Sequence, residues 1–485
     1  MSIVQIPNTN KIVIIDCLTS IETANAAFML YQDHHKERFQ REPEIHALLY
    51  THNHVDHFGG AQAIVKLAGD ENIRIIGPDG FLEHAVSENS PTGQIGCGLG
   101  QGLSRGHSSL VAPNQSIKED DGVLRPGIVG LEIICQLTPG TEAPAEVNSY
   151  FPAYNGFCMA ENATHTLHNI QTLRGAPVRD ARLWSRYLDE SISLFGHKAD
   201  VVFSSHHWPT WKHDGAGSGI QDDKVETPRI LILTFLSEQR DYYAHLHNET
   251  LRLLNNGSTP AEISEQIMTP PNLSLRTNLR GYDGSGNLRF AATLLNKIIF
   301  ADPKNTDAKN ELISVYRELG QGAENGTWCN RYLCGAHELQ YGPHEAINVM
   351  TPSSVMALNL GELFDTMAIR INGPEAFALE NAIAINFMVE DMPRKSLPGK
   401  GPIGWHLRLS NGAMTGHGIP FVSFKNPRDG GDMKDSKAEL TVWLSHGTLV
   451  TVVGTAAAGH KTEIKTYQVV TLGDPGQGHC LYPKA

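Results

Sequence analysis

Three histidines and one aspartate lie within six consecutive residues of the segment THNHVDHFGG, as His52, His54, Asp56 and His57. The segment follows the apolar run HALLY and leads into two glycines, so it is predicted to leave a buried strand and to turn. Imidazole nitrogens and carboxylate oxygens are ligands that Zn²⁺ and similar borderline ions prefer in proteins. A single histidine here would indicate a surface residue, but four such side chains after a buried strand predict a metal centre.

Four side chains cannot complete two metal sites, and further candidate ligands follow other predicted strands. Glu142 lies in the Pro- and Gly-containing segment LTPGTEAPAE, and Glu161 follows the apolar run FCMA. A carboxylate that ends an apolar strand is costly unless it is paired or coordinated. His206 and His207 both follow VVFSS, so either could supply a further imidazole. Together these residues predict a binuclear centre that is built from several strand ends.

The elements that must position these side chains alternate between short apolar runs and longer amphipathic patterns. Strands are predicted from β-branched runs, and helices from apolar residues that recur every three or four positions. Because strands alternate with helices, this region is predicted to be a layered α/β domain. The predicted strands cover residues 11–16, 46–51, 73–78, 131–137 and 200–206, and the predicted helices cover 21–39 and 178–196.

The pattern of the remaining chain changes twice after the segment HHWPTW. From about residue 229 to 342 it is almost wholly helical. From 343 onward it predicts a small α+β domain with an antiparallel sheet, including a hairpin with the Asn-Gly turn at 411–412. This last segment has no cluster of His, Asp and Glu, so its predicted role is binding or assembly.

Composition excludes two classes of partner. The net charge of −13 argues against a nucleic-acid surface, which needs clustered Lys and Arg. No run of about 20 apolar residues occurs, so no transmembrane segment is predicted. The N-terminus also lacks the pattern of a secretory signal. Seven scattered cysteines fit reduced thiols, and the expected location is therefore cytoplasmic.

The motifs THNHVDHFGG, LTPGTEAPAE, MAENATHTLHN, TLRGAPVRDA and HHWPTW occur in an order that resembles the alkyl sulfatases (type III sulfatases) of the metallo-β-lactamase superfamily. The first motif indicates only the superfamily, whereas the motifs with Glu142 and Glu161 separate alkyl sulfatases from lactamases and glyoxalases. The resemblance implies a metallo-β-lactamase αββα sandwich at 1–228, an all-α dimerisation domain at 229–342 and an α+β domain similar to sterol carrier protein 2 at 343–485. It also implies a homodimer.

The resemblance assigns an activity and roles to residues. It implies two Zn²⁺ ions per chain and hydrolysis of alkyl or aryl sulfate esters to an alcohol and inorganic sulfate, because zinc lowers the pKa of water until hydroxide forms at neutral pH. In the implied arrangement His52, His54 and Glu142 bind one ion, Asp56, His57 and His206 bind the other, and Glu161 bridges them. The implied catalytic residues are Glu161, Asp56 and His165. Guanidinium groups match sulfate oxygens, and the implied substrate-binding residues are Asn169, Arg174 and Arg179.

Three departures from the family pattern leave alternatives open. Relative to the family, the chain is shorter ahead of KIVIID, between AVSEN and the Gly-rich segment at 91–106, and between LRGYDGSG and NLRFAATLL. One alternative is a di-zinc hydrolase that acts on another ester, a lactone or a thioester. The other is a degraded sulfatase that serves as a lipid-binding module through its C-terminal domain.

Overall fold

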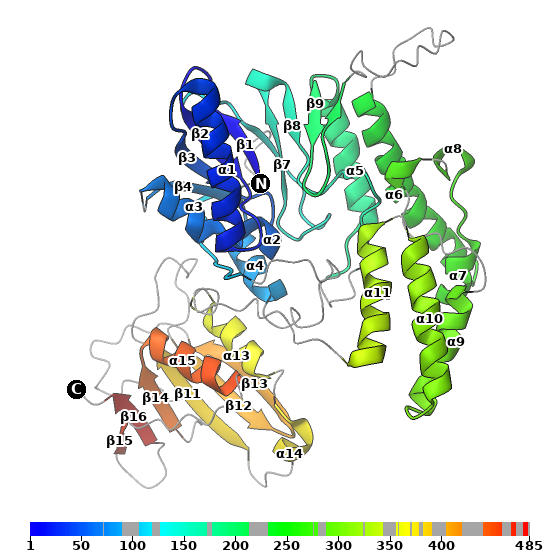
Figure 1. The fold of residues 1–485 in the computed structure, drawn as a ribbon. Helices are drawn as coiled ribbons and strands as arrows, with labels where there is room; N and C mark the ends of the chain where they lie inside the picture. The colour runs from blue at the N-terminus through cyan, green and yellow to red at the C-terminus, as the bar shows by residue number, and fades with distance from the viewer. Residues whose placement is uncertain are drawn as a thin grey trace, which may run out of the picture. The chain divides into compact units, whose positions relative to one another are not determined.

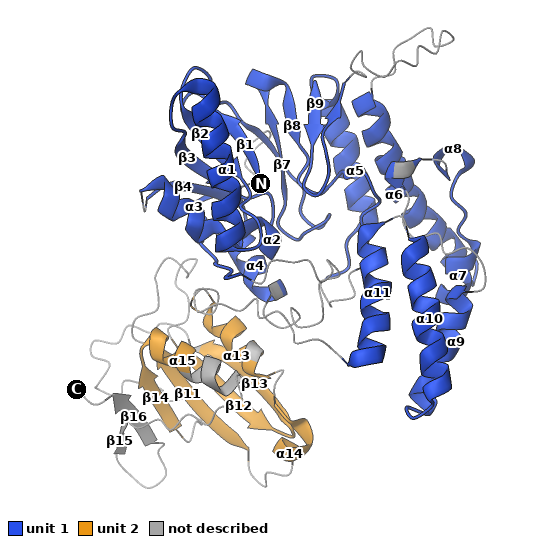
Figure 2. Cartoon of the chain, in the orientation of Figure 1, with its two compact units in different colours: residues 1–349 blue, residues 350–485 orange. Residues whose placement is uncertain are grey.

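The computed structural model of the protein forms two compact units, residues 1–349 and 350–485, which Figure 2 colours separately. The predicted boundary near residue 229 falls inside the first unit. The division of the chain into three domains therefore stays a prediction. The residues that the structure describes are 1–70, 72–89, 106–118, 127–171, 177–212, 231–274, 276–279, 288–323, 325–342, 356, 358–368, 371–377, 382–389, 404–419, 440–457, 467–471 and 479–483.

The first unit contains two five-stranded sheets (Figure 1). The first has the order β1-β2-β3-β4-β5, with strands at Ser2–Gln5, Lys11–Ile15, Glu44–Leu49, Arg74–Pro78 and Gln115–Ile117. The second has the order β10-β9-β8-β7-β6, and β6 to β10 cover Ile134–Leu137, Val147–Phe151, Gly156–Cys158, Val201–Phe203 and Thr210–Trp211. Strands β2 to β5 run parallel, as do β8 and β9, so the carboxyl ends of neighbouring parallel strands lie together.

An apolar core lies between the two sheets. Val13 and Ile15 of the first sheet share one cluster with Val147 and Phe151 of the second, and all four are buried. Successive side chains of a strand point to opposite faces, so the outer face of each sheet needs a helical cover. Figure 1 shows these covers, and the four layers confirm the predicted αββα sandwich. Helices α1 (Ile21–Phe39) and α3 (Ala61–Ala68) cover the first sheet, and α5 (Ala181–Ser191) and α6 (Leu231–Asn255) cover the second.

The structure confirms the predicted helix at 21–39 and shortens the one predicted at 178–196. Helix α1 starts after Ser20, whose hydroxyl accepts a hydrogen bond from the Thr23 amide in a capping box. It ends at Gln40, which adopts the left-handed conformation. Helix α5 begins only at residue 181, because the Asp180 carboxylate caps its first amides, and its last turn is π-helical over Ile192–Gly196. Strand β7 was not predicted, because its sequence VNSYF contains Asn148 and Ser149 and is not an apolar run.

The rest of the first unit is helical, as predicted. Among the described residues, no helix combines the length and the apolar character that crossing a membrane requires. The short helix α4 covers Phe81–Asn89. The helices after α6 are α7 (Pro260–Gln266), α8 (Pro271–Ser274), α9 (Leu288–Ala301), α10 (Thr306–Gly322) and α11 (Gly326–Tyr341).

The second unit contains a six-stranded sheet of order β13-β12-β11-β14-β16-β15. The predicted hairpin is confirmed, because β12 and β13 pair through a turn at Asn411 and Gly412, which both have positive φ. The prediction of an antiparallel sheet is wrong in part, since β11 pairs parallel with β14 and β14 with β16. Parallel pairs join strands that are distant in sequence, so local patterns do not indicate them. The elements are α13 (Leu360–Ala368), α14 (Gly373–Phe377), β11 (Ile383–Val389), β12 (Gly404–Ser410), β13 (Ala413–Ile419), β14 (Leu440–Leu444), α15 (His446–Ala457), β15 (Tyr467–Thr471) and β16 (His479–Pro483).

Candidate metal centre

The histidine-rich segment leaves β3 and enters the short helix α2 (Val55–Phe58) at the carboxyl end of the first sheet. Its two glycines do not serve a left-handed turn, since φ is −58° at Gly59 and −89° at Gly60. They allow close approach instead. A Cβ on Gly59 would lie 2.0 Å from the Thr19 carbonyl oxygen, and one on Gly60 would lie 2.2 Å from that of Cys17. The turn therefore packs directly on the backbone that follows β2.

One group of candidate ligands consists of His52, His54 and Glu142, all buried. Glu142 Oε2 lies 3.3 Å from His52 Nε2 and 3.0 Å from His54 Nδ1. Neither His52 Nε2 nor Glu142 Oε2 has a hydrogen-bond partner among the described residues. Buried polar atoms without a partner are costly, and a shared cation would satisfy both. The donor set therefore fits a metal ion.

A second group consists of Asp56, His57, Glu161 and His206. Glu161 Oε1 lies 2.8 Å from His57 Nε2 and 2.6 Å from His206 Nε2. Asp56 Oδ2 lies 3.5 Å from His57 Nε2 and 3.2 Å from His206 Nε2. The neighbouring His207 packs on the His165 ring, with centroids 5.3 Å apart, and belongs to no group of candidate ligands. Of the two histidines that follow β9, His206 is therefore the one the fold brings to the carboxylates.

Each histidine of the THNHVDH segment turns its second ring nitrogen toward a polar partner. Such outer partners fix the ring orientation and the tautomer of metal-binding histidines. Asp16, at the end of β2, also accepts hydrogen bonds from the Thr51 amide and hydroxyl. Of these partners, Asp16 could have been predicted, because it is another carboxylate at a strand end. The pairs are His52 Nδ1 with Thr51 Oγ1 at 3.0 Å, His54 Nε2 with Glu88 Oε2 at 3.2 Å, and His57 Nδ1 with Asp16 Oδ2 at 2.8 Å.

Three non-glycine residues around the centre have left-handed backbone. They are Asp16 with φ of 57°, Ala160 with φ of 49° and His206 with φ of 64°. This conformation is disfavoured for L-residues, at a cost on the order of 1–3 kcal/mol each, and it clusters at functional sites. Each one lies one to three residues after the end of a strand, where a candidate ligand or its partner follows the sheet. Three of the eight left-handed non-glycine residues in the described part of the chain therefore lie at the candidate metal centre.

The charges of the second group are strongly coupled. Burial lowers the pKa of His57, but the carboxylates of Asp56 and Asp16 outweigh it and hold that pKa well above the ordinary value. The negative charge of Glu161 raises the pKa of His206 to about 10. In contrast, burial lowers the pKa of His52 to about 3. Protons thus sit on two imidazoles between carboxylates, at positions where a divalent cation would replace them.

Sequence reasoning missed Glu146, a fully buried carboxyl behind the centre. Its Oε2 accepts hydrogen bonds from the Thr141 hydroxyl at 2.8 Å and from the Glu142 and Ala143 amides at 3.1 Å. Its Oε1 accepts one from the Glu161 amide at 3.2 Å. Burial and the charge of Glu142 raise the pKa of Glu146 to about 8. One side chain therefore organises both glutamate-bearing loops, a role that sequence spacing alone does not reveal.

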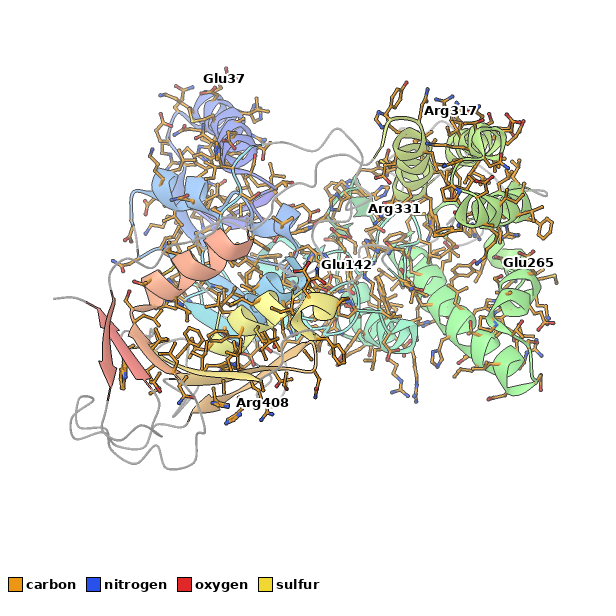
Figure 3. All side chains as sticks on the ribbon, turned by 90° about the horizontal axis from the view of Figure 1, so that it is seen from below. Glu37, Glu142, Glu265, Arg317, Arg331 and Arg408 are labelled. Carbon is orange, nitrogen blue, oxygen red and sulfur yellow. The ribbon has the colours of Figure 1, made fainter. Side chains whose placement is uncertain are left out.

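A cavity of about 400 Å³ opens beside the two groups. Glu142 lines it from the turn between β6 and β7, and Arg331 lines it from α11; Figure 3 labels both. The predicted substrate-binding residues Asn169 and Arg179 also line the cavity, whereas Arg174 lies outside the described residues. His168, which sequence reasoning passed over, lines the cavity as well.

The predicted catalytic residue His165 does not line this cavity. Its ring stacks on Phe235 with centroids 5.0 Å apart and lies at the same distance from Trp208. Its Nε2 lies 2.9 Å from the Thr210 hydroxyl. These contacts give His165 a place in the packing between α6 and the segment after β9. The geometry therefore offers its predicted catalytic role no support.

Three family models match the chain. They are the metallo-beta-lactamase superfamily at residues 1–131, the alkyl sulfatase dimerisation domain at 284–342 and the alkyl sulfatase C-terminal domain at 348–480. A linear primary-alkylsulfatase of Pseudomonas sp. is 31% identical, over 91% of this chain and 70% of the relative. The chain belongs to the alkyl sulfatase family.

Other relatives of the chain are members of the same family. An (R)-specific secondary-alkylsulfatase of Pseudomonas sp. is 31% identical over 92% of this chain and 72% of that protein. An alkyl/aryl-sulfatase of Saccharomyces cerevisiae is 31% identical over 76% of this chain and 66% of that protein. The solved structure of a stereoselective inverting sec-alkylsulfatase of Pseudomonas sp. aligns with a TM-score of 0.71 and 29% identity, covering 95% of this chain and 77% of that one. The fold and the ligand clusters of this alkyl sulfatase indicate bound metal ions.

Proposed function

We propose that the protein hydrolyses alkyl sulfate esters to an alcohol and inorganic sulfate at a centre of two Zn²⁺ ions. The observation that carries the proposal is the pair of ligand groups, His52–His54–Glu142 and Asp56–His57–Glu161–His206, both of which contribute residues to the lining of one cavity. When bound, the ions supply Lewis acidity and make water nucleophilic at neutral pH. The names of the relatives support sulfate esters as the substrate class.

The side chains of this chain bind, orient and hold charge. In the proposed assignment, the first group holds one ion, and Asp56, His57 and His206 hold the other. The family motif implies that Glu161 would serve both ions; its Oε1 faces the imidazoles of the second group, and its amide donates to the same Glu146 that holds the Glu142 loop. A site of imidazole nitrogens and carboxylate oxygens favours Zn²⁺ over Mg²⁺ or Ca²⁺, because the latter two ions prefer oxygen ligands only.

The anionic head of the substrate needs donors at the cavity wall. We propose Asn169 and Arg174 for this role, as the family motif implies. The wall also includes Trp328 and Arg331 of α11, so the helical part of the first unit contributes to the cavity. The cavity volume of about 400 Å³ accommodates a sulfate head and part of an alkyl chain, within the usual range for small-molecule sites.

We also infer that the protein is a homodimer that uses α9. The dimerisation family model covers this helix, and none of its residues is buried. Phe290 and Phe300 are 69% and 78% exposed, and two such exposed aromatic side chains on one helix are unusual for a monomer. A second copy of this chain would cover that face. Sedimentation equilibrium of the full chain tests the inference, and a monomer at micromolar concentration would contradict it.

Metal content and sulfate release test the proposed activity separately. Elemental analysis of the purified protein should give about two zinc per chain, and dodecyl sulfate should release inorganic sulfate in a reaction that a chelator stops. Bound metal without turnover of any alkyl or aryl sulfate would refute the substrate and favour another ester, a lactone or a thioester. A preparation that binds no metal would refute the centre itself and favour a non-catalytic binding module.

A further inference from the structure

Arg179 is buried beside the metal centre and has almost no donor left for a substrate. It is 6% exposed and directly precedes Asp180, the N-cap of α5. Its Nε donates to the Glu142 carbonyl at 2.5 Å, and its Nη2 donates to Glu142 Oε1. Its Nη1 donates to the Asn169 carbonyl at 2.6 Å and to His168 Nδ1 at 3.1 Å. A guanidinium has five N–H donors, so one remains, and a bidentate sulfate clamp needs two parallel ones.

The contact with Arg179 determines the tautomer of His168. Arginine only donates, so His168 Nδ1 must accept, and this contact at 3.1 Å is shorter than the 3.4 Å from Nδ1 to the Asn169 carbonyl. The neutral ring then carries its proton on Nε2, which lies 3.1 Å from Glu161 Oε2. A metal ligand must offer a lone pair. His168 therefore donates to Glu161 and is not itself a ligand in this arrangement, although its Nε2 lies close to both glutamates.

Arg179 and His168 each bind one carboxylate oxygen of a glutamate and leave the other oxygen facing the candidate metal ligands. Arg179 takes Oε1 of Glu142, which leaves Oε2 toward His52 and His54. His168 takes Oε2 of Glu161, which leaves Oε1 toward the imidazoles of the second group. A carboxylate with one oxygen held in this way can rotate neither oxygen freely. The pair therefore selects which oxygen of each glutamate faces a metal ion.

The pair is anchored by α6, by the N-cap of α11 and by a backbone hydrogen bond of Arg179 itself. The Tyr243 hydroxyl of α6 donates to the His168 carbonyl at 3.2 Å. The side-chain amide of Asn325, which also caps α11, donates to the Leu167 carbonyl at 3.2 Å. The Arg179 amide donates to the Ile170 carbonyl at 2.9 Å. These bonds hold the segment with His168 to α6, to the start of α11 and to the residue that precedes the N-cap of α5.

We propose that Arg179 and His168 are positioning residues that orient Glu142 and Glu161 for the metal ions, and that Arg179 is not part of the sulfate clamp. This inference rests on the proposed metal centre. If Arg179 is not part of the clamp, other donors of the cavity must bind the sulfate group. Metal binding then depends on Arg179, which is buried. Loss of an outer partner of a metal ligand lowers metal affinity by about 10- to 100-fold.

The test compares Arg179→Lys, His168→Ala and the double variant with wild type, and it uses Co²⁺ as a spectroscopic probe. Lysine keeps the charge but cannot reach Glu142 and His168 at once. Each single variant should lose about 10- to 100-fold in metal affinity by chelator competition and should shift the visible Co²⁺ absorption. The double variant should be no weaker than the worse single one, because the two residues act as a unit. At saturating metal, KM for dodecyl sulfate should stay unchanged.

Two controls keep the outcome interpretable. Arg182→Lys, on the exposed face of α5, should leave affinity, spectrum and KM as in wild type, and circular dichroism should show that each variant folds. His168→Gln can still donate to Glu161, so it should recover part of the affinity that His168→Ala loses. An unchanged Co²⁺ spectrum with KM raised about tenfold or more in Arg179→Lys would overturn the inference and restore the clamp. Altered spectra without any sulfate release would uphold the inference while refuting the proposed activity.

Discussion

Replacement of Asp16 by asparagine should weaken metal binding without breaking the fold. The Asp16 carboxylate accepts three hydrogen bonds, from the Thr51 amide at 2.8 Å, the Thr51 hydroxyl at 2.7 Å and His57 Nδ1 at 2.8 Å. Asparagine keeps the first of these through its carbonyl oxygen, but its NH₂ group replaces the oxygen that accepts the other two. Asparagine also tolerates the left-handed backbone of this position, where φ is 57°. The variant therefore removes the bond that orients His57 with little added backbone strain.

The expected loss in metal affinity is about 10- to 100-fold, which corresponds to about 1.4–2.7 kcal/mol. Apoprotein is titrated with zinc against a chromophoric chelator of known affinity, and circular dichroism checks that the variant is folded. Asp33→Asn, an exposed position of α1, is the matched control and should bind zinc as wild type does. If folded Asp16→Asn binds zinc within about twofold of wild type, the orientation of His57 does not depend on its outer partner, and the reasoning fails.

Three further predictions concern protons, packing and assembly. In the metal-free protein His57 and His206 have raised pKa values, the latter about 10, so both carry protons at pH 7. Metal binding should therefore release up to about two protons per chain. Calorimetry in buffers of different ionisation enthalpy measures this release. Gly60→Ala should unfold or destabilise the protein by several kcal/mol, because the added Cβ would lie 2.2 Å from a backbone oxygen, whereas Gly322→Ala, with open space around it, should leave the thermal midpoint unchanged or slightly higher. Phe300→Asp should shift the dimer toward monomer in sedimentation velocity while metal content stays constant; an unchanged dimer would exclude α9 from the interface.

Much of the sandwich could be predicted from local patterns. Helix α1 matches its predicted range because a capping box starts it and a left-handed residue ends it, and both signals are local. The parallel strands β2, β3 and β4 contain the short apolar runs IVII, ALL and II, as expected for strands that are covered on both faces. Strands β8 and β9 have only three residues each. Their apolar runs are visible in the sequence, but their length depends on pairing partners that are far away in sequence.

The candidate ligands could be predicted better than the residues that hold them. A carboxylate or imidazole shortly after a predicted strand is visible in the sequence, and this signal pointed to Glu142, Glu161 and the pair His206 and His207. Only the family resemblance chose His206 from that pair. Glu146 and His168 carry no such signal, because their role depends on which oxygen or amide they meet in three dimensions. The same limit applies to Arg179, which has the residue type of a sulfate clamp but contacts that belong to a positioning residue.

The joint between the two sheets explains why the centre needs the whole sandwich. His52 follows a strand of the first sheet, yet its backbone forms a β-bridge with Glu146, which precedes β7 of the second. The Val147 amide donates to the Thr51 carbonyl at 2.9 Å, which adds a second bond across the same joint. These contacts place the Glu146 carboxyl behind both glutamates at the point where the sheets meet. A disturbance of the sheet-to-sheet register would therefore move the histidine segment and the glutamate loops relative to each other, so metal affinity should report on the packing of the sandwich as well as on the ligands themselves.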